Sequence, residues 1–253
     1  MSALLRISAI AFVFAASSIH ASAEVPANSQ TYLSRSFQQL DTIARTRRAE
    51  GSLPRLANPR DAKVLEALWD RKEILGSGPY RSADVPILLD AFEKENAVFK
   101  TYVFFSPDPQ KLPQTDQNTA FFQDEVSRSS AFLLSVYSSG LEALTDFVAQ
   151  LKPGEFNDAR RQGLQQTRMG IQEFVSGAVI MMRSPALRVE NRVAIADALQ
   201  ENAKRLAASM SVVDRQALVA IASTLTDPET APQLKSFTAA MQSTECVGLC
   251  LIP

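Results

Sequence analysis

The stretch that decides the fold is Gly163-Leu-Gln-Gln-Thr-Arg-Met-Gly170-Ile-Gln-Glu-Phe-Val-Ser-Gly177-Ala-Val-Ile-Met-Met182, in which three glycines stand seven residues apart. Seven residues make close to two helical turns, so the three glycines lie nearly in line, drifting only about 20° per step. A glycine inside a helix costs roughly 1 kcal/mol relative to alanine, and the whole chain has only nine glycines. The line leaves a groove without side chains, which predicts a central helix with a neighbouring helix close along it.

An apolar stripe beside the glycine line consists of Leu164, Ile171, Phe174, Val175, Ala178 and Met182. Close helix packing is the simpler interpretation of the groove. The alternative is a site for a flat or elongated apolar ligand between this helix and the preceding one. The candidate residues for that site are Gly163, Gly170, Glu173, Gly177, Tyr137 and Met181. Glu173 would be a functional candidate if it were buried, but we favour an exposed, solvated side chain.

Helical spacing of apolar residues continues on both sides of this stretch. It predicts helices over about 30–50, 58–76, 82–105, 118–151 and 185–210, followed by two shorter ones. Four helix starts carry a capping residue with a proline or an acidic third position, and they are Asn58-Pro59, Ser184-Pro185, Ser211 with Asp214, and Asp227-Pro228. We therefore predict a single all-α domain, a multi-helix globular bundle of about seven or eight helices. The helix over 118–151 and the glycine helix, joined at Pro153-Gly154, should form its central antiparallel hairpin.

The first 23 residues have the features of a cleavable signal peptide. Arg6 precedes an apolar stretch from Ile7 to Ser17, and Ala21-Ser22-Ala23 matches a cleavage site. The apolar stretch is too short to span a membrane, which takes about 20 residues. We expect a mature domain over residues 24–253 in a bacterial periplasm or outside the cell, without a transmembrane segment.

Composition excludes several classes of function. The mature chain would have a net charge of −2, which gives no overall case for nucleic-acid binding. The only histidine, His20, lies in the predicted signal peptide. Ser-His-Asp catalysis, Cys-His catalysis and His-ligated metals are therefore excluded. We predict no catalytic motif, no metal site and no cofactor.

The C-terminal segment over 246–253 contains the only two cysteines, Cys246 and Cys250. In an oxidising compartment two cysteines this close should pair, and the disulfide would hold the apolar end of the chain in one shape. A redox role is the alternative. We favour the structural role, because thiol oxidoreductases use a Cys-x-x-Cys motif that this chain lacks.

Two further segments are candidates for contact with a partner. Residues 45–81, from the last turn of the first helix onward, form a basic segment rich in arginine that could bind anions or an acidic partner. Its candidate residues are Arg45, Arg47, Arg48, Arg55 and Arg60. The simpler interpretation is a solvated helix face with interleaved acidic residues. The loop over 106–117 contains three prolines, and long loops of this kind often carry partner contacts.

The sequence leaves three hypotheses for function. The first is a non-enzymatic helical binding or interaction protein with an unknown protein partner. The second is a carrier for an apolar small molecule held between the central helices. The third is an enzyme that uses carboxylate, Tyr or Ser chemistry without histidine, and it ranks last because no nucleophile–base motif is present. A carrier needs an enclosed apolar cavity beside the glycines, whereas an interaction protein needs an exposed apolar surface.

Overall fold

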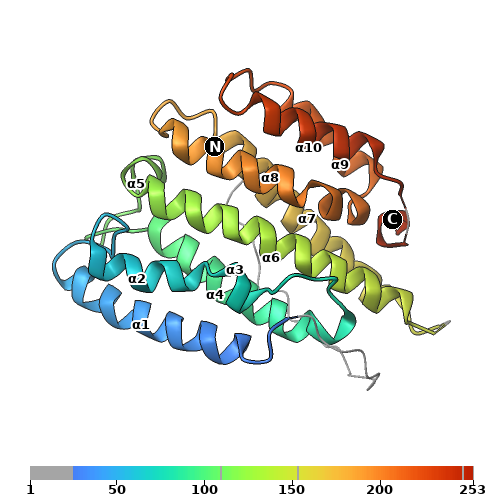
Figure 1. The fold of residues 1–253 in the computed structure, drawn as a ribbon, viewed down its shortest axis with the longest axis horizontal. Coiled ribbons are helices and arrows are strands. Elements are labelled where there is room, and N and C mark those ends of the chain that lie inside the picture. Colours follow the sequence, from blue (N-terminus) through green and yellow to red (C-terminus); the bar gives the residue numbers. More distant parts are fainter. Residues whose placement is uncertain (1–24, 109, 153, 247, 253) are drawn as a thin grey trace.

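Helices make up all the regular structure in residues 25–108, 110–152, 154–246 and 248–252, which the computed structural model describes (Figure 1). The predicted all-α bundle is thereby confirmed, whereas the predicted signal peptide lies outside these ranges. In chain order the helices are α1 (Ser29–Ala49), α2 (Pro59–Leu68), α3 (Arg71–Ile74), the 3-10 helix η1 (Ser82–Asp84), α4 (Val85–Val103), α5 (Thr115–Phe121), α6 (Gln123–Ala149), α7 (Asp158–Met181), α8 (Val189–Ser209), α9 (Val212–Ala222), α10 (Ala231–Ser243) and the 3-10 helix η2 (Gly248–Leu251).

Two predicted helix starts are confirmed by their caps. Asn58 accepts a hydrogen bond from the backbone N–H of Arg60 (3.0 Å), with Pro59 as the first residue of α2. The Ser211 hydroxyl accepts from the backbone N–H of Asp214 (3.2 Å) and donates to its carboxylate (2.7 Å). These bonds satisfy donors that the first turn of a helix leaves without intrahelical partners.

Two other helices begin later than predicted. Ser184-Pro185 belongs to a turn, and α8 begins only at Val189. Asp227-Pro228 is also a turn, because the Asp227 carboxylate accepts from the N–H of Glu229 (3.0 Å), and α10 begins at Ala231. In both cases the capping residue closes a turn before the helix begins.

Two predicted long helices are each divided in two. The helix over 58–76 is interrupted at Trp69 and Asp70, where the Asp70 carboxylate caps α3. The helix over 118–151 is interrupted at Phe122, and its first part, α5, begins within the predicted proline-rich loop, at Thr115. Phe122 is buried against Tyr102 of α4, with 5.4 Å between the ring centroids.

Polar contacts hold α6 and α8 side by side in the same direction (Figure 1). Each pair joins residues 64 to 67 positions apart in the sequence, and this nearly constant separation is the signature of parallel packing. The pairs are Asn191 with Asp124, Asn202 with Ser138, and Ser209 with Thr145. The two helices are therefore in register over most of their length.

Asn202 is fully buried in the middle of this contact. Its side-chain amide donates to the Ala198 carbonyl (2.8 Å) and the Ser135 hydroxyl (3.2 Å). Its carbonyl oxygen accepts from the Ser138 hydroxyl (2.6 Å). Ser135 and Ser138 thus face α8.

The other helices extend this pair into a row. Helix α4 packs on α6 in the opposite direction, because Ser82 at the start of η1–α4 donates to Asp146 near the end of α6 (2.8 Å). Helix α10 packs on the far side of α8, and α1 lies beyond α4 (Figure 1). The buried side chains form one continuous core that extends from Val25 to Leu249. Among the described helices, none is sufficiently long and apolar for a membrane crossing.

Helix α7 differs from its predicted place. It runs antiparallel to α6, as expected of consecutive helices, but the most extensive contacts of α6 are with α8 and α4. Helix α7 instead crosses behind α6 and α8 in the view of Figure 1 and shares most of its contacts with α9. The middle of the bundle is therefore α6, and the glycine helix connects α6 to α8 from one side.

We expect Asn202→Ala to lower the free energy of unfolding by about 1–3 kcal/mol, because it removes three buried hydrogen bonds and leaves polar groups without partners. Urea unfolding measures this change. Gln200→Ala, on the exposed side of the same helix, is the control and should change stability by less than about 0.5 kcal/mol. An equal loss in both variants would show that Asn202 does not hold the two helices together.

Candidate functional site

The inner face of α7 is the predicted apolar stripe. All six of its members are buried, and they are Leu164, Ile171, Phe174, Val175, Ala178 and Met182. Asn157 caps the start of α7, and its side chain accepts from the N–H of Arg160 (3.0 Å). Sequence and structure agree on which side of α7 faces the core.

The glycine line lies at the edge of this buried face. Gly163, Gly170 and Gly177 are all half-buried. A methyl group added at Gly170 would contact nothing within 4 Å. The prediction of a helix packed closely along the glycine line is therefore wrong at Gly170.

The physical reason lies in the side chains that separate α7 from α6. The rings of Phe174 on α7 and Tyr137 on α6 pack with 4.9 Å between their centroids. Ser138, a small residue one position after Tyr137 on α6, faces α8 and donates a hydrogen bond to Asn202. Large aromatic residues thus fill the α6–α7 contact, and the small residues of α6 pack elsewhere.

A second glycine stands at the same level on α6. Gly140 lies about one turn after Tyr137, and Gly170 lies about one turn before Phe174. Because the two helices are antiparallel, both steps lead in the same direction from the ring contact. A methyl group at Gly140 would also contact nothing within 4 Å. Each helix therefore has unoccupied space beside its backbone at this level.

The exposed edge of α7 carries apolar side chains next to the glycines. Met169 is 52% exposed and Ile180 is 47% exposed. Glu173 is also exposed, and it makes no ion pair with any described residue. Met181 is partly buried against the core. We name Met169, Gly170, Gly177 and Ile180 the open face of α7.

Tyr137 is a buried member of an aromatic cluster between α4, α6 and α7. Its ring contacts Phe174 and also Phe92 of α4, with 5.2 Å between the latter centroids. Burial raises the pKa of its phenol well above the ordinary value. Its hydroxyl has no hydrogen-bond partner among the described residues, and neither does the side-chain oxygen of buried Asn96, one turn along α4 from Phe92.

Another buried group, Glu95, lies on the adjoining side of α4. Neither of its carboxylate oxygens has a hydrogen-bond partner of normal geometry in the described chain. Burial raises the pKa of this carboxyl well above its usual value, and the nearby Trp69 indole offsets part of the rise. Glu95 is thus most stable in its neutral form inside the protein.

The arginines of the basic segment are largely engaged within the chain. Arg45 pairs with Asp41, and Arg47 lies 3.2 Å from Glu50 and 3.3 Å from Asp61.

Arg55 lies 3.3 Å from buried Glu125 and stacks 4.5 Å from the centre of the Phe121 ring. Arg48 and Arg60 make no ion pair with the described residues. The five arginines are therefore not grouped as one free cationic surface.

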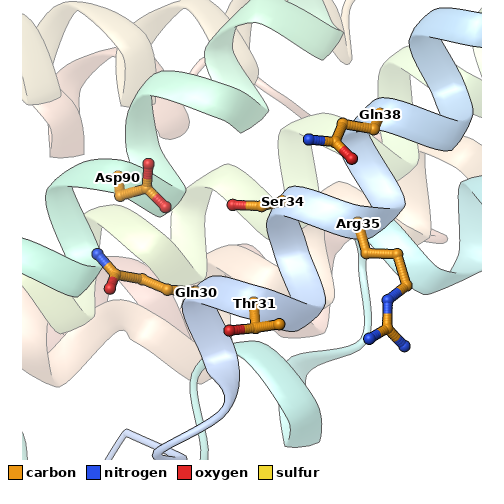
Figure 2. A pocket seen from close by; sticks show the side chains of 6 residues that line it. All are labelled: Gln30, Thr31, Ser34, Arg35, Gln38 and Asp90. Atoms are coloured by element: carbon orange, nitrogen blue, oxygen red, sulfur yellow. The ribbon is translucent and has the colours of Figure 1, made fainter.

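A polar cleft of about 470 Å³ separates α1 from α4 (Figure 2). Asp90 of α4 faces Gln30 and Ser34 of α1 across it, and Asp90 is paired with Lys94. The side chains that line it are Gln30, Thr31, Ser34, Arg35, Gln38 and Asp90. None of them is buried, so the cleft is a solvated surface feature rather than an apolar cavity.

The C-terminal segment contains the predicted disulfide, Cys246–Cys250. Two buried arginines hold it, Arg168 from α7 and Arg215 from α9. Neither arginine is among the residues predicted from the sequence. A signal was present, because Arg168 stands four residues after Leu164 and three before Ile171, within the apolar stripe of α7.

No metal-binding group of three or more His, Cys, Asp or Glu side chains is found within the described ranges. Comparison of the chain with models of protein families, with curated proteins and with solved structures finds no match. Function must therefore be argued from the open face of α7, the aromatic cluster and the C-terminal segment.

We expect Gly170→Ala and Gly140→Ala each to raise the free energy of unfolding by about 0.5–1 kcal/mol. Both positions lie inside helices, and the new methyl group meets no neighbour. Thermal and urea unfolding measure the gain. Gly51→Ala is the contrasting control and should destabilise, because Gly51 has a φ of +74°. A loss of stability at Gly170 would mean that a neighbour does pack there.

We expect Glu95→Gln to flatten the dependence of stability on pH. In the unfolded chain Glu95 ionises near pH 4.3, but in the folded protein its pKa is raised. Its contribution to stability is therefore full below about pH 4.3 and is lost as pH rises towards the folded pKa. Urea unfolding between about pH 4 and 8 measures the slope. The exposed neighbour Glu93→Gln is the control, and an unchanged slope in Glu95→Gln would contradict a neutral buried carboxyl.

Proposed function

We propose that this chain is an exported, non-enzymatic binding protein that docks an apolar helix of a partner protein on the open face of α7. One observation carries the proposal. Gly170 stands inside a 24-residue helix, and apart from its chain neighbours and the backbone of its own helix no described atom lies within 4 Å of the position its Cβ would occupy. It lowers helix stability by roughly 1 kcal/mol, and no close intramolecular contact offsets this. A partner that packs closely against the backbone at Gly170 would offset this cost.

The spacing of the glycines favours a helix as that partner. Two helices lying side by side meet through positions that repeat about every seven residues, and Gly163, Gly170 and Gly177 have this repeat. Met169 and Ile180 supply apolar contacts beside the line. Glu173 supplies a charged edge, as the rim of a protein interface commonly does. This arrangement resembles the general mode in which an amphipathic helix lies in an apolar groove.

The proposed location rests on the sequence. Residues 1–23 have the pattern of a signal peptide, and a disulfide suits a periplasmic or extracellular compartment. The partner would therefore be another exported protein or the exported part of a membrane protein.

A carrier of an apolar small molecule is the second candidate, and the aromatic cluster favours it. Tyr137 and Asn96 each bring a buried polar atom without a partner to this cluster, and a ligand with one hydrogen-bonding group could satisfy one of them. The enzyme hypothesis gains no support. Glu173 is exposed and unpaired, and the group that perturbs Glu95 besides burial is the indole of Trp69.

Site-specific photo-crosslinking in the periplasm tests the proposal. A photoreactive amino acid replaces Met169, Ile180 or Leu112, the last of which lies in the 106–117 loop and is 89% exposed. We expect a protein adduct from Met169 and Ile180 and none from Leu112. Gly170→Leu should abolish the adduct by filling the space, and Gly170→Ala should lower its yield, because even one methyl group holds a partner helix away from the backbone. Both variants should fold, since a Cβ at Gly170 meets no neighbour and the position lies at the half-buried edge of α7, and circular dichroism checks this.

Native mass spectrometry of the mature protein separates the alternatives. A reproducible extra mass of a small organic molecule, lost in Gly170→Leu, would replace the proposal with the carrier hypothesis. An adduct formed only from Leu112 would show that the partner binds the 106–117 loop and not the open face of α7. An adduct from Met169 that persists in folded Gly170→Leu would show that the glycine line is not the contact.

A further inference from the structure

The Cys246–Cys250 disulfide closes a very short loop, since its cysteines are four positions apart. In the chain-entropy account, closing a loop this short stabilises the folded state less than closing a long loop does. Little folding free energy therefore opposes its reduction.

The two sulfurs lie in different surroundings. Cys250 is 4% exposed, whereas Cys246 is only half-buried. An external thiolate can therefore approach the sulfur of Cys246 more readily than that of Cys250. In such an attack, Cys250 is the leaving group.

Arg215 is placed to stabilise that leaving group. Its Nη2 lies 3.8 Å from the Cys250 sulfur, and its Nη1 donates to the Thr244 carbonyl (2.6 Å). Arg215 is itself 6% exposed, so solvent screens its charge little. A cation beside a cysteine favours the thiolate form, and a more stable leaving thiolate speeds thiol–disulfide exchange.

The two acidic residues near Arg215 do not pair with its guanidinium. Asp214 accepts a hydrogen bond from Ser211 on its own helix cap, and its charge acts on Arg168. Glu245 is exposed next to Cys246. Neither carboxylate makes an ion pair with Arg215 in the described chain.

We propose that Cys246–Cys250 is an exchange-active disulfide that reacts with an external dithiol, with Cys246 attacked and Arg215 stabilising the Cys250 thiolate. A thiolate of the dithiol forms a bond to the Cys246 sulfur. The Cys246–Cys250 bond breaks, and its electron pair remains on Cys250.

The second thiol of the dithiol then loses its proton and attacks the mixed disulfide, which releases Cys246 as a thiolate that takes up a proton. The dithiol is oxidised by two electrons, and the protein disulfide is reduced by two. The reverse sequence oxidises the Cys246 and Cys250 thiols and reduces the disulfide of the external molecule. This activity is independent of the helix-docking function proposed above.

A matched pair of arginine variants tests the proposal with dithiothreitol as the dithiol. Arg168 also anchors the C-terminal segment, because its Nη1 donates to the Leu249 carbonyl (2.8 Å), but it makes no hydrogen bond to a sulfur within the described residues. The full-length oxidised protein, Arg215→Met and Arg168→Met are reduced under identical conditions, and the thiols that appear are alkylated and counted by mass. The thiol pKa values of the reduced proteins follow from thiolate absorbance.

We expect Arg215→Met to slow reduction about fivefold, to raise the pKa of the Cys250 thiol, and to lower the equilibrium constant for reduction by glutathione about tenfold. Arg168→Met should stay within about twofold of the parent rate, since it loses a carbonyl contact alone. Equal slowing in both variants would show that Arg215 only anchors the C-terminal segment, as Arg168 does, and it would overturn the proposal. Faster reduction in Arg215→Met would show that burial protects the disulfide, and it would overturn the proposal.

Trapping with a monothiol gives a second measurement that needs no variant. The parent protein reacts with excess glutathione, is quenched with acid, and is mapped by peptide mass. The proposal requires the mixed disulfide on Cys246 and the free thiol on Cys250. A mixed disulfide on Cys250 would overturn it even if Arg215→Met failed to fold.

Discussion

The hydrogen bonds of Asn202 fix how α6 and α8 lie against each other, and the rest of the bundle is arranged on that pair. Two parallel helices cannot be joined by a short turn, so a further helix must return the chain from the end of α6 to the start of α8. Helix α7 does this, and α4 and α10 then cover the two outer sides of the pair. Because α7 serves as the return, one of its edges remains available to solvent or to a partner.

Much of the fold could be predicted from sequence, because local signals decide helix existence. The stripe from Leu164 to Met182 and the caps at Asn58 and Ser211 were correct. The packing order could not be predicted, since it depends on one buried amide, Asn202, whose partners lie more than sixty residues away. Helix α7 follows α6 in the sequence, which led to the prediction that the two pack together. The buried hydrogen bonds instead join α6 to α8.

The candidate site shows the same limit. The glycine spacing identified an unusual edge of α7, yet only the structure shows that Gly170 has empty space beside it. The disulfide followed from two cysteines in a short segment, whereas the surroundings of its sulfurs did not. Arg215 comes from a different helix, and its distance to Cys250 is set by how α9 packs on α7 and α10. The surroundings of the two sulfurs therefore depend on how the helices pack, which the local sequence does not reveal.

The parallel register of α6 and α8 also has a consequence for how chains of this type can change in length. Residues gained or lost within the two turns that flank α7 leave every α6–α8 contact in place, because those contacts depend on the two helices and not on the path between them. The same change inside α6 or α8 would displace Asn202 from Ser138 and misalign the whole pair. Natural length variation should therefore concentrate in the turns on either side of α7.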